Sequence, residues 1–307
     1  MNASTNKVKT YIALMSVILS SAWSAAARDT NDAGRLRGRI TTFSLKGPAS
    51  QMAAEGSVYL PPAYSQSADL AWPVMYFLHG SGGVSGIKIL AAYAERAAAE
   101  KICRPFIIAE IRGAQTPQCW WLDATATKSK AGTLVSRDFV QAVESRYRVM
   151  RSREGRIIAG FSMGGFGAMA QLFQHPELFA TGVAYDGGFF KEVPADRADI
   201  RARLEKLFGG DTAVFLAMTP QGRAAQYATL PADERPAVDY QLITGAFRDR
   251  IEAFQRQLAE AGVALTGRVV VTTAKHDLAQ VLDQCWREHF RFLGRRLDAG
   301  DAVPKAL

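Results

Sequence analysis

The sequence predicts an α/β fold, with a mostly parallel central sheet and helices on both faces. Short apolar runs alternate with stretches of helical spacing along most of the 307 residues, and this order requires crossover connections between parallel strands. Runs such as residues 74–78 are apolar throughout, as expected of strands buried on both faces. A glycine-rich turn at residues 160–165 joins one predicted strand directly to a helix.

The individual elements follow from apolar runs and from the spacing of apolar residues. Strands are predicted at residues 56–60, 74–78, 106–111, 156–161, 179–185, 238–244 and 268–273. Helices are predicted at residues 87–101, 134–147, 166–173, 251–261 and 278–297. Pro61 and Pro62 end the first strand, and Gly262 ends the fourth helix. The less regular residues 191–236 are expected to form helices over the carboxyl edge of the sheet, as part of a pocket roof.

Residues 1–27 are expected to be a cleaved signal peptide. Lys7 and Lys9 precede an uncharged apolar stretch at residues 11–23, and three consecutive alanines then give the small-residue pattern that signal peptidase accepts. A membrane anchor is the alternative, but the stretch is shorter than the about 20 apolar residues that span a bilayer. We therefore expect residues 28–307 to form a single α/β domain that is secreted or periplasmic, without stable membrane insertion.

The composition is that of an ordinary globular chain. Hydrophobic residues make up 48% and charged residues 21%, which excludes a disordered protein. The net charge of +8 would suit an acidic partner, but the basic residues are dispersed and no nucleic-acid-binding motif is found, so no nucleic-acid partner is expected. Cys103, Cys119 and Cys285 allow at most one disulfide, and their pairing stays open, as does the oligomeric state. Their spacing does not indicate a metal site.

The strongest motif is residues 160–165, Gly-Phe-Ser-Met-Gly-Gly, which fits G-x-S-x-G. A predicted strand comes directly before it and a predicted helix directly after it, which is the context of a nucleophilic serine. Small flanking residues suit the strained turn, and the helix N-terminus favours the negative charge of a tetrahedral intermediate. Ser162 is therefore the predicted nucleophile. A glycine-rich turn without chemistry is the alternative.

Through this motif and three further segments, the chain resembles the esterase D and feruloyl-esterase-like branch of the α/β-hydrolases, which also includes S-formylglutathione hydrolases and mycolyltransferases. The resemblance rests on Val-Tyr-Leu-Pro-Pro at 58–62, Pro-Val-Met-Tyr-Phe-Leu-His-Gly at 73–80, Ser-Met-Gly-Gly-Phe-Gly-Ala at 162–168 and His-Pro-Glu-Leu-Phe at 175–179. It extends over residues 40–295 and is looser in the C-terminal third. It implies the α/β-hydrolase fold and ester hydrolysis by a Ser–acid–His triad, with neither metal nor cofactor.

The order of the triad in this fold, Ser then acid then His, leaves His276 and His289 as candidate bases. His276 follows the last predicted strand, where this fold delivers its base, and is the predicted catalytic histidine. His289 falls in the middle of the last predicted helix and is expected to be a surface or packing residue. The related group usually has glycines before this histidine, whereas Ala274 and Lys275 stand here.

Asp249 is the preferred catalytic acid. It follows the predicted strand at 238–244, in the loop where the resemblance places the acid, a few residues past Gly245. Its carboxylate would hold one tautomer of His276 and stabilise the imidazolium. Two alternatives remain: Asp249 could cap the next helix, and Asp186, after the preceding strand, is the rival acid.

The oxyanion hole is expected to use the backbone N–H of Met163 and that of Gly80 or Ser81, in the glycine-rich turn after the strand at 74–78. The resemblance also puts an aromatic segment beside the active site. Trp120 and Trp121 are therefore candidate substrate-binding residues, with ordinary loop packing as the alternative.

Three functions are consistent with these features. The first is an exported serine esterase that acts on a small-molecule or polysaccharide-linked ester. The second is an acyltransferase of the mycolyltransferase type, in which an alcohol replaces water. The third is a catalytically inactive binding protein of the same fold, which the intact set of serine, acid and histidine disfavours.

Overall fold

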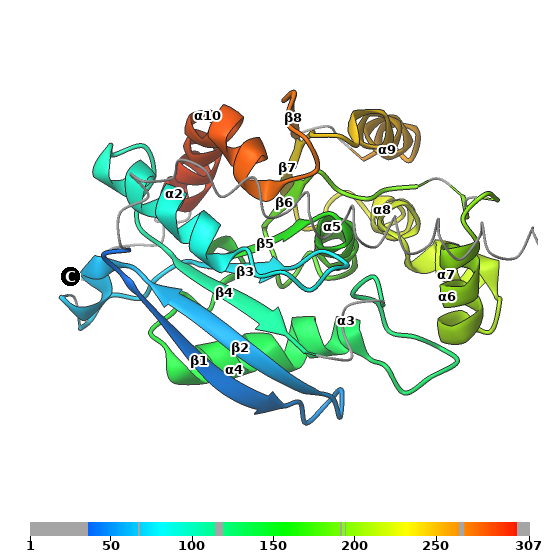
Figure 1. Ribbon diagram of the computed structural model, residues 1–307, viewed down its shortest axis with the longest axis horizontal. Coiled ribbons are helices and arrows are strands. Elements are labelled where there is room, and N and C mark those ends of the chain that lie inside the picture. Colours follow the sequence, from blue (N-terminus) through cyan, green and yellow to red (C-terminus); the bar gives the residue numbers. More distant parts are fainter. Residues whose placement is uncertain are drawn as a thin grey trace, which may run out of the picture. The chain divides into compact units, whose positions relative to one another are not determined.

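The computed structural model describes residues 36–66, 68–113, 119–190, 192–193, 195–263 and 267–299 (Figure 1). The described residues from Arg37 onward form one compact unit. The expected signal peptide, residues 1–27, lies outside the described residues. Among the residues that are described, no helix combines the length and the apolar character needed to cross a bilayer.

An eight-stranded sheet runs in the order β1-β2-β4-β3-β5-β6-β7-β8. Its strands are β1 (Arg39–Lys46), β2 (Ala53–Leu60), β3 (Val74–Leu78), β4 (Ile107–Arg112), β5 (Arg156–Phe161), β6 (Thr181–Tyr185), β7 (Asp239–Ile243) and β8 (Arg268–Val270). β1 pairs antiparallel with β2 and β2 with β4, while every other neighbouring pair is parallel. The predicted mostly parallel sheet is confirmed. The loops that leave the carboxyl ends of β3 to β8 therefore meet at one edge of the sheet.

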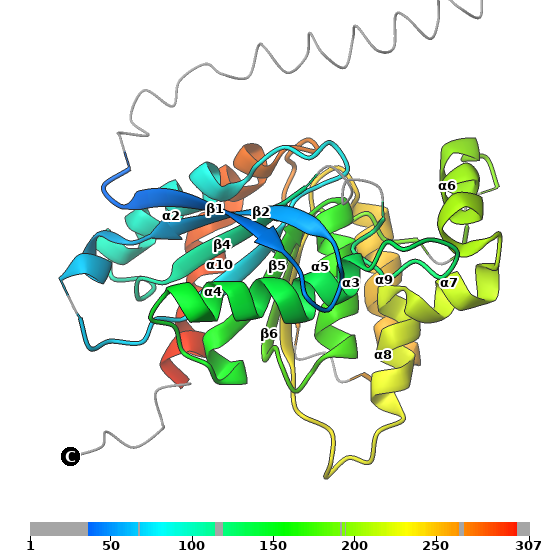
Figure 2. The same cartoon turned by 90° about the horizontal axis from the view of Figure 1, so that it is seen from below.

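Helices cover both faces of this sheet (Figures 1 and 2). They are α2 (Ile87–Ala99), α3 (Ala131–Thr133), α4 (Val140–Arg146), α5 (Met163–Gln174), α6 (Ala198–Phe208), α7 (Thr212–Met218), α8 (Pro220–Ala228), α9 (Arg248–Glu260) and α10 (Leu278–Ala299). α2 and α10 pack against each other on one face, and α4, α5, α8 and α9 lie on the other. A π-helical stretch, Leu134–Phe139, joins α3 to α4.

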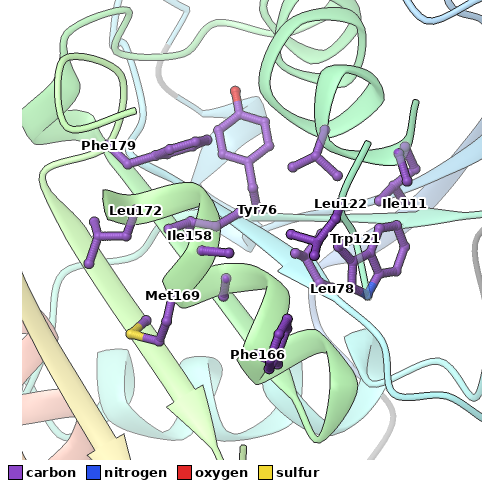
Figure 3. Packing of buried hydrophobic residues seen from close by; sticks show 14 of the residues in the cluster. Tyr76, Leu78, Ile111, Trp121, Leu122, Ile158, Phe166, Met169, Leu172 and Phe179 are labelled. Carbon is purple, nitrogen blue, oxygen red and sulfur yellow. The ribbon is translucent and has the colours of Figure 1, made fainter. Parts of the chain in front are cut away.

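Adjacent residues of each buried strand supply the two faces of the core, because successive side chains of a strand point in opposite directions. On β3, the ring of Tyr76 packs edge-on against Phe179 (Figure 3) and against Phe139 on the α4 and α5 side. The next residue, Phe77, meets Tyr185 on the α2 and α10 side. All five rings are buried, so β3 at the centre of the sheet is covered on both faces.

The predicted strands and helices agree with the structure to within a few residues at each end, apart from β1, which was not predicted. Its residues lie at the edge of the sheet and, apart from Leu45, are exposed or only partly buried, and polar residues interrupt the apolar ones, so they form no apolar run. Residues 191–236 do contain helices, α6 to α8. α8 packs along α5, while the carbonyl oxygen of Leu207 at the end of α6 accepts from the N–H of Ala126, in the loop after β4.

Candidate active site

Ser162 stands at the sharp turn between β5 and α5. Its φ of 58° and ψ of −117° form a conformation that side chains rarely adopt, so the turn is strained. Its neighbours have no room for a side chain. A Cβ on Gly164 would lie 1.9 Å from the carbonyl oxygen of Leu78, and one on Gly160 would lie 2.1 Å from that of Gly164. The two glycines thus let β3, β5 and α5 approach closely enough to present Ser162 at the carboxyl edge of the sheet.

The imidazole of His276 faces Ser162. Its Nε2 lies 2.9 Å from Ser162 Oγ, which is the reach expected between a nucleophile and its base. The loop that carries His276 leaves β8 at Val270 and ends at Asp277. The Asp277 carboxylate accepts from the N–H of Gln280 at 2.9 Å, in the manner of a helix N-cap, and so fixes the start of α10 beside the site.

The carboxylate that holds His276 is that of Asp186, directly after β6. Asp186 Oδ2 lies 2.5 Å from His276 Nδ1, and the Asp186 side chain is completely buried. Because a carboxylate can only accept, Nδ1 carries the proton and Nε2 is left to accept one from Ser162. The prediction that Asp249 holds His276 was wrong. Asp249 is exposed in the first turn of α9, where an acidic side chain stabilises the helix by interacting with the helix dipole.

The loop after β7 explains why the carboxylate beside His276 comes from the end of β6. It folds back over Asp186, and the N–H groups of Gly245 and Phe247 donate to Asp186 Oδ1 at 2.7 and 2.8 Å. A Cβ on Gly245 would lie 2.9 Å from Asp186 Cγ, so this close approach needs glycine. α9 then begins at Arg248 and turns Asp249 outward. The loop expected to supply the acid instead supplies two hydrogen-bond donors to it.

Two phenyl rings pack against the imidazole of His276. The ring of Phe161 lies 4.7 Å away between centroids at an interplanar angle of 27°, and that of Phe247 lies 4.2 Å away at 33°. These two contacts restrict the orientation of the imidazole. The His276 side chain remains 33% exposed, which leaves its reacting edge open.

The segments expected to form the oxyanion hole lie beside Ser162. Met163 is the first residue of α5, where the N–H groups of a helix have no partner within the helix. A Cβ on Gly80 would lie 3.3 Å from Ser162 Cβ, so the turn after β3 passes the serine at contact distance. Ser81, the next residue of the turn, is exposed.

Both peptide planes of this turn are fixed through their carbonyl groups. The indole Nε1–H of Trp121 donates to the oxygen of His79 at 3.1 Å. His79 Nδ1–H and Gly83 N–H donate to the oxygen of Gly80 at 2.8 and 3.0 Å. Since the N–H and the C=O of a trans peptide point in opposite directions, the N–H groups of Gly80 and Ser81 point away from these partners. Burial also lowers the pKa of His79, so its ring is neutral.

Trp120 and Trp121 lie in the core, and the structure therefore favours the packing interpretation of both over substrate contact. They are 4% and 0% exposed. The ring of Trp120 packs against Phe215 of α7, with centroids 5.0 Å apart. Their φ values are 52° and 61°, and left-handed backbone is unusual at any bulky residue and more so at two in succession.

Glu110, a fully buried carboxylate on β4, was not predicted from the sequence. Its oxygens accept from the hydroxyl of Ser85 and, at 2.9 Å, from the N–H of Gly86. Burial raises the pKa of Glu110. These contacts anchor Ser85 and Gly86, which join the predicted oxyanion turn, residues 79–83, to α2. A charged residue inside the apolar run at 106–111 was the signal that could have revealed it.

His289 is a packing residue, which is one of the two roles expected for it. It is fully buried, and its Nδ1–H donates to Gln241 Oε1 at 2.7 Å while its Nε2 accepts from the hydroxyl of Tyr185 at 2.7 Å. Burial lowers its pKa to about 3, so the ring is neutral.

The cysteines lie apart from this chemistry. All three are buried, and burial raises the pKa of each thiol, to about 12 for Cys103 and Cys285 and to about 11 for Cys119. Among the residues that the structure describes, no group of three or more histidine, cysteine or acidic side chains could hold a metal ion.

Comparison with known sequences finds a family match over part of the chain. Residues 49–187 match the family described as putative esterase, a segment that includes Ser162 and Asp186 and ends before His276. A Corynebacterium glutamicum protein described as uncharacterized is 25% identical over 202 residues, which make up 63% of this chain and 46% of that protein. The chain therefore spans about half the length of this curated relative.

Solved structures share the fold. A ferulic acid esterase matches with a TM-score of 0.66 and 21% identity over 86% of this chain and 100% of its own. An S-formylglutathione hydrolase from Agrobacterium tumefaciens matches at 0.64 and 19% identity, covering 86% and 97%. A fluorophosphonate-binding serine hydrolase of Staphylococcus aureus matches at 0.63 and 15%, covering 83% and 98%. The predicted α/β-hydrolase fold is confirmed.

Proposed function

We propose that this chain, whose residues 49–187 match the family described as putative esterase, hydrolyses carboxylic esters by way of an acyl-enzyme on Ser162. The observation that carries the proposal is one hydrogen-bonded series: Ser162 Oγ lies 2.9 Å from His276 Nε2, and His276 Nδ1 lies 2.5 Å from Asp186 Oδ2. A serine hydroxyl is a weak nucleophile until a base accepts its proton. In this series His276 is the base, and Asp186 fixes its tautomer and its orientation.

In the first half of the reaction, Ser162 Oγ forms a bond to the ester carbonyl carbon while its proton passes to His276 Nε2. The carbonyl oxygen becomes an oxyanion. The N–H of Met163 and those of Gly80 and Ser81 are the donors available to it at the carboxyl edge of the sheet. The tetrahedral intermediate then collapses. The bond to the alcohol oxygen breaks, and the imidazolium gives its proton to that oxygen.

In the second half, water replaces the alcohol. His276 Nε2 accepts a proton from the water as its oxygen attacks the acyl carbon. Collapse of the second intermediate returns the proton to Ser162 Oγ and releases the carboxylic acid. Throughout, the ionised Asp186 stabilises the imidazolium, and its own charge is held by the N–H groups of Gly245 and Phe247.

Hydrolysis of p-nitrophenyl acetate by the purified chain tests the proposal. Ser162→Ala and His276→Ala are expected to lower kcat by about 1,000-fold or more. His175→Gln is the matched control, since His175 is a surface histidine paired with Glu177. The control should keep full activity. A Ser162→Ala protein as active as the unaltered chain would contradict the proposal.

Product analysis separates hydrolysis from acyl transfer. The same reaction is run with a disaccharide acceptor present, and the products are identified by mass spectrometry. Free acetic acid is the product that the proposal expects. Acylated sugar as the main product would instead identify an acyltransferase.

We further propose that the enzyme is exported. The proposal is supported by the sequence of residues 1–27, in which two lysines, an apolar stretch and three alanines follow one another. N-terminal sequencing of the mature protein should find its first residue at or just before Arg28. An intact N-terminus on protein from the cytoplasm would contradict export.

A further inference from the structure

Trp121 connects the two segments that are brought together at the nucleophile. Its indole N–H donates to the carbonyl oxygen of His79 at 3.1 Å, and its own carbonyl oxygen accepts from Gln171 Nε2 at 3.1 Å. His79 begins the oxyanion turn after β3, and Gln171 belongs to α5, the helix that starts beside Ser162. One residue thus contacts both sources of oxyanion donors.

The side chain of Trp121 is closely packed by its neighbours. The indole is completely buried and lies in the core cluster that also holds Leu78 and Leu122 (Figure 3). Its Cβ packs on α5 at Gly167, where an added Cβ would lie 2.5 Å from it. Its ring meets the His79 imidazole edge-on, 4.9 Å away between centroids.

The backbone of Trp121 is held in an unfavourable conformation. Its φ is 61°, in a left-handed region that a bulky residue rarely adopts. Strain of this kind persists only where surrounding contacts determine it, and it concentrates at functional sites. The contacts that hold Trp121 in this conformation are those with the oxyanion turn and with α5.

From this geometry we propose that Trp121 is a positioning residue for the oxyanion hole. Its indole N–H fixes the plane of the peptide between His79 and Gly80, and so aims the N–H of Gly80 and sets the path of Ser81. The hydrogen bond from Gln171 fixes the distance of Trp121 from α5, which carries Met163. This inference rests on the proposed ester hydrolysis, because the oxyanion hole has a use only if an oxyanion forms on the substrate.

Trp121→Phe is the direct test, because it removes the indole N–H and keeps most of the buried ring. Since loss of one oxyanion donor costs about 100- to 1,000-fold in kcat, a donor left in place but misaligned should cost about 10- to 100-fold. KM for p-nitrophenyl acetate should change by less than about threefold, since ground-state binding does not use the aligned donors. Trp120→Phe is the matched control: its ring packs on α7 and no contact joins it to the turn among those described.

A second readout distinguishes positioning from general damage. An aryl trifluoromethyl ketone forms a tetrahedral adduct whose oxyanion occupies the hole, so its inhibition constant should rise in Trp121→Phe by the same factor by which kcat/KM falls. Gln171→Met should move both quantities in the same direction by a smaller factor, and it carries the test if Trp121→Phe does not fold. Melting temperature by circular dichroism identifies the folded variants.

The outcomes separate the two proposals. An unaltered chain that hydrolyses the ester, together with folded variants whose kcat and inhibition constant are unchanged, would overturn the role of Trp121 alone. A fall in kcat with no change in the inhibition constant would also overturn that role. An unaltered chain with no more activity than Ser162→Ala would overturn the proposed function and this inference together.

Discussion

Asp186 Oδ2 and His276 Nδ1 lie 2.5 Å apart although 90 residues separate them in the chain. The contact joins the carboxyl end of β6 to the loop after β8, across β7. It is possible because β6, β7 and β8 run parallel and end at one edge of the sheet. The loop after β7, which lies between them, adds its N–H groups to Asp186 and places its own acid, Asp249, on the surface.

The first prediction concerns the identity of the acid. Asp186→Asn keeps the shape of the side chain but removes the charge that stabilises the imidazolium, so kcat should fall by about 1,000-fold or more. Asp249→Asn is the matched control and should change kcat by less than about twofold, because its side chain is exposed in the first turn of α9. Steady-state kinetics on p-nitrophenyl acetate measures both. A large fall in kcat for Asp249→Asn, with little change for Asp186→Asn, would instead identify Asp249 as the catalytic acid.

The second prediction concerns the glycine beside that acid. In Gly245→Ala the new Cβ would lie 2.9 Å from Asp186 Cγ, so the carboxylate must shift and pull His276 out of line. Because small misplacements of catalytic groups cost about 100-fold, kcat should fall by about 10- to 100-fold with KM almost unchanged. Ala246→Ser, at the exposed neighbouring position, is the control. Full activity in Gly245→Ala would show that this contact does not position the acid.

A third prediction follows from the buried histidine on α10. Burial lowers the pKa of His289 to about 3, below the ordinary value of about 6.5. Between these values the unfolded chain binds a proton at this position that the native state does not, so stability rises with pH and is lost as the solution is acidified. One such proton changes the free energy of unfolding by on the order of 1 kcal/mol per pH unit.

Urea unfolding of the unaltered chain and of His289→Gln, at about pH 5.5 and about pH 4.5, measures this effect. Glutamine cannot titrate, and it can still bond Gln241 or Tyr185. The free energy of unfolding of the unaltered chain should therefore fall more steeply with acidification than that of the variant. Equal slopes would mean that His289 is protonated in the folded protein.

The fourth prediction concerns the packing of the nucleophile turn. Gly164→Ala would place a Cβ 1.9 Å from the carbonyl oxygen of Leu78, between two rigid backbones. Overpacking of this kind costs about 1–3 kcal/mol or more, so the melting temperature should drop by several degrees or the protein should fail to fold. Gly82→Ala is the control, because the nearest atom to its Cβ would be 3.9 Å away, on Val84. Equal melting temperatures for the two variants would contradict the close approach.

The sequence was sufficient for the features that depend on local pattern. Buried parallel strands are apolar runs, so the order of strands and helices could be read directly. The serine turn is set by adjacent glycines, and His276 is the histidine that directly follows the last strand. These predictions need no knowledge of how distant loops are arranged in space.

The acid could not be predicted in the same way. Asp186 and Asp249 both follow a strand that ends at the same edge of the sheet, and the choice between them depends on the path of one loop. That path is fixed by two backbone hydrogen bonds to Asp186. Because almost any residue can supply a backbone N–H, Gly245 is the only residue type in the loop that indicates them. For the same reason, the sequence could not tell whether Trp121 would face a substrate or hold the turn, because that depends on where its loop crosses α5.

The proposed mechanism depends most directly on an activated Ser162, and a fluorophosphonate probe measures that activation without knowledge of the natural ester. The purified chain is treated with the probe, and the adduct is located by mass spectrometry. The mechanism predicts one adduct, on Ser162, that His276→Ala and Asp186→Asn abolish or greatly slow and that Asp249→Asn leaves unchanged. Folded protein that carries no adduct, or an adduct on Ser162 that forms equally fast in all three variants, would contradict it.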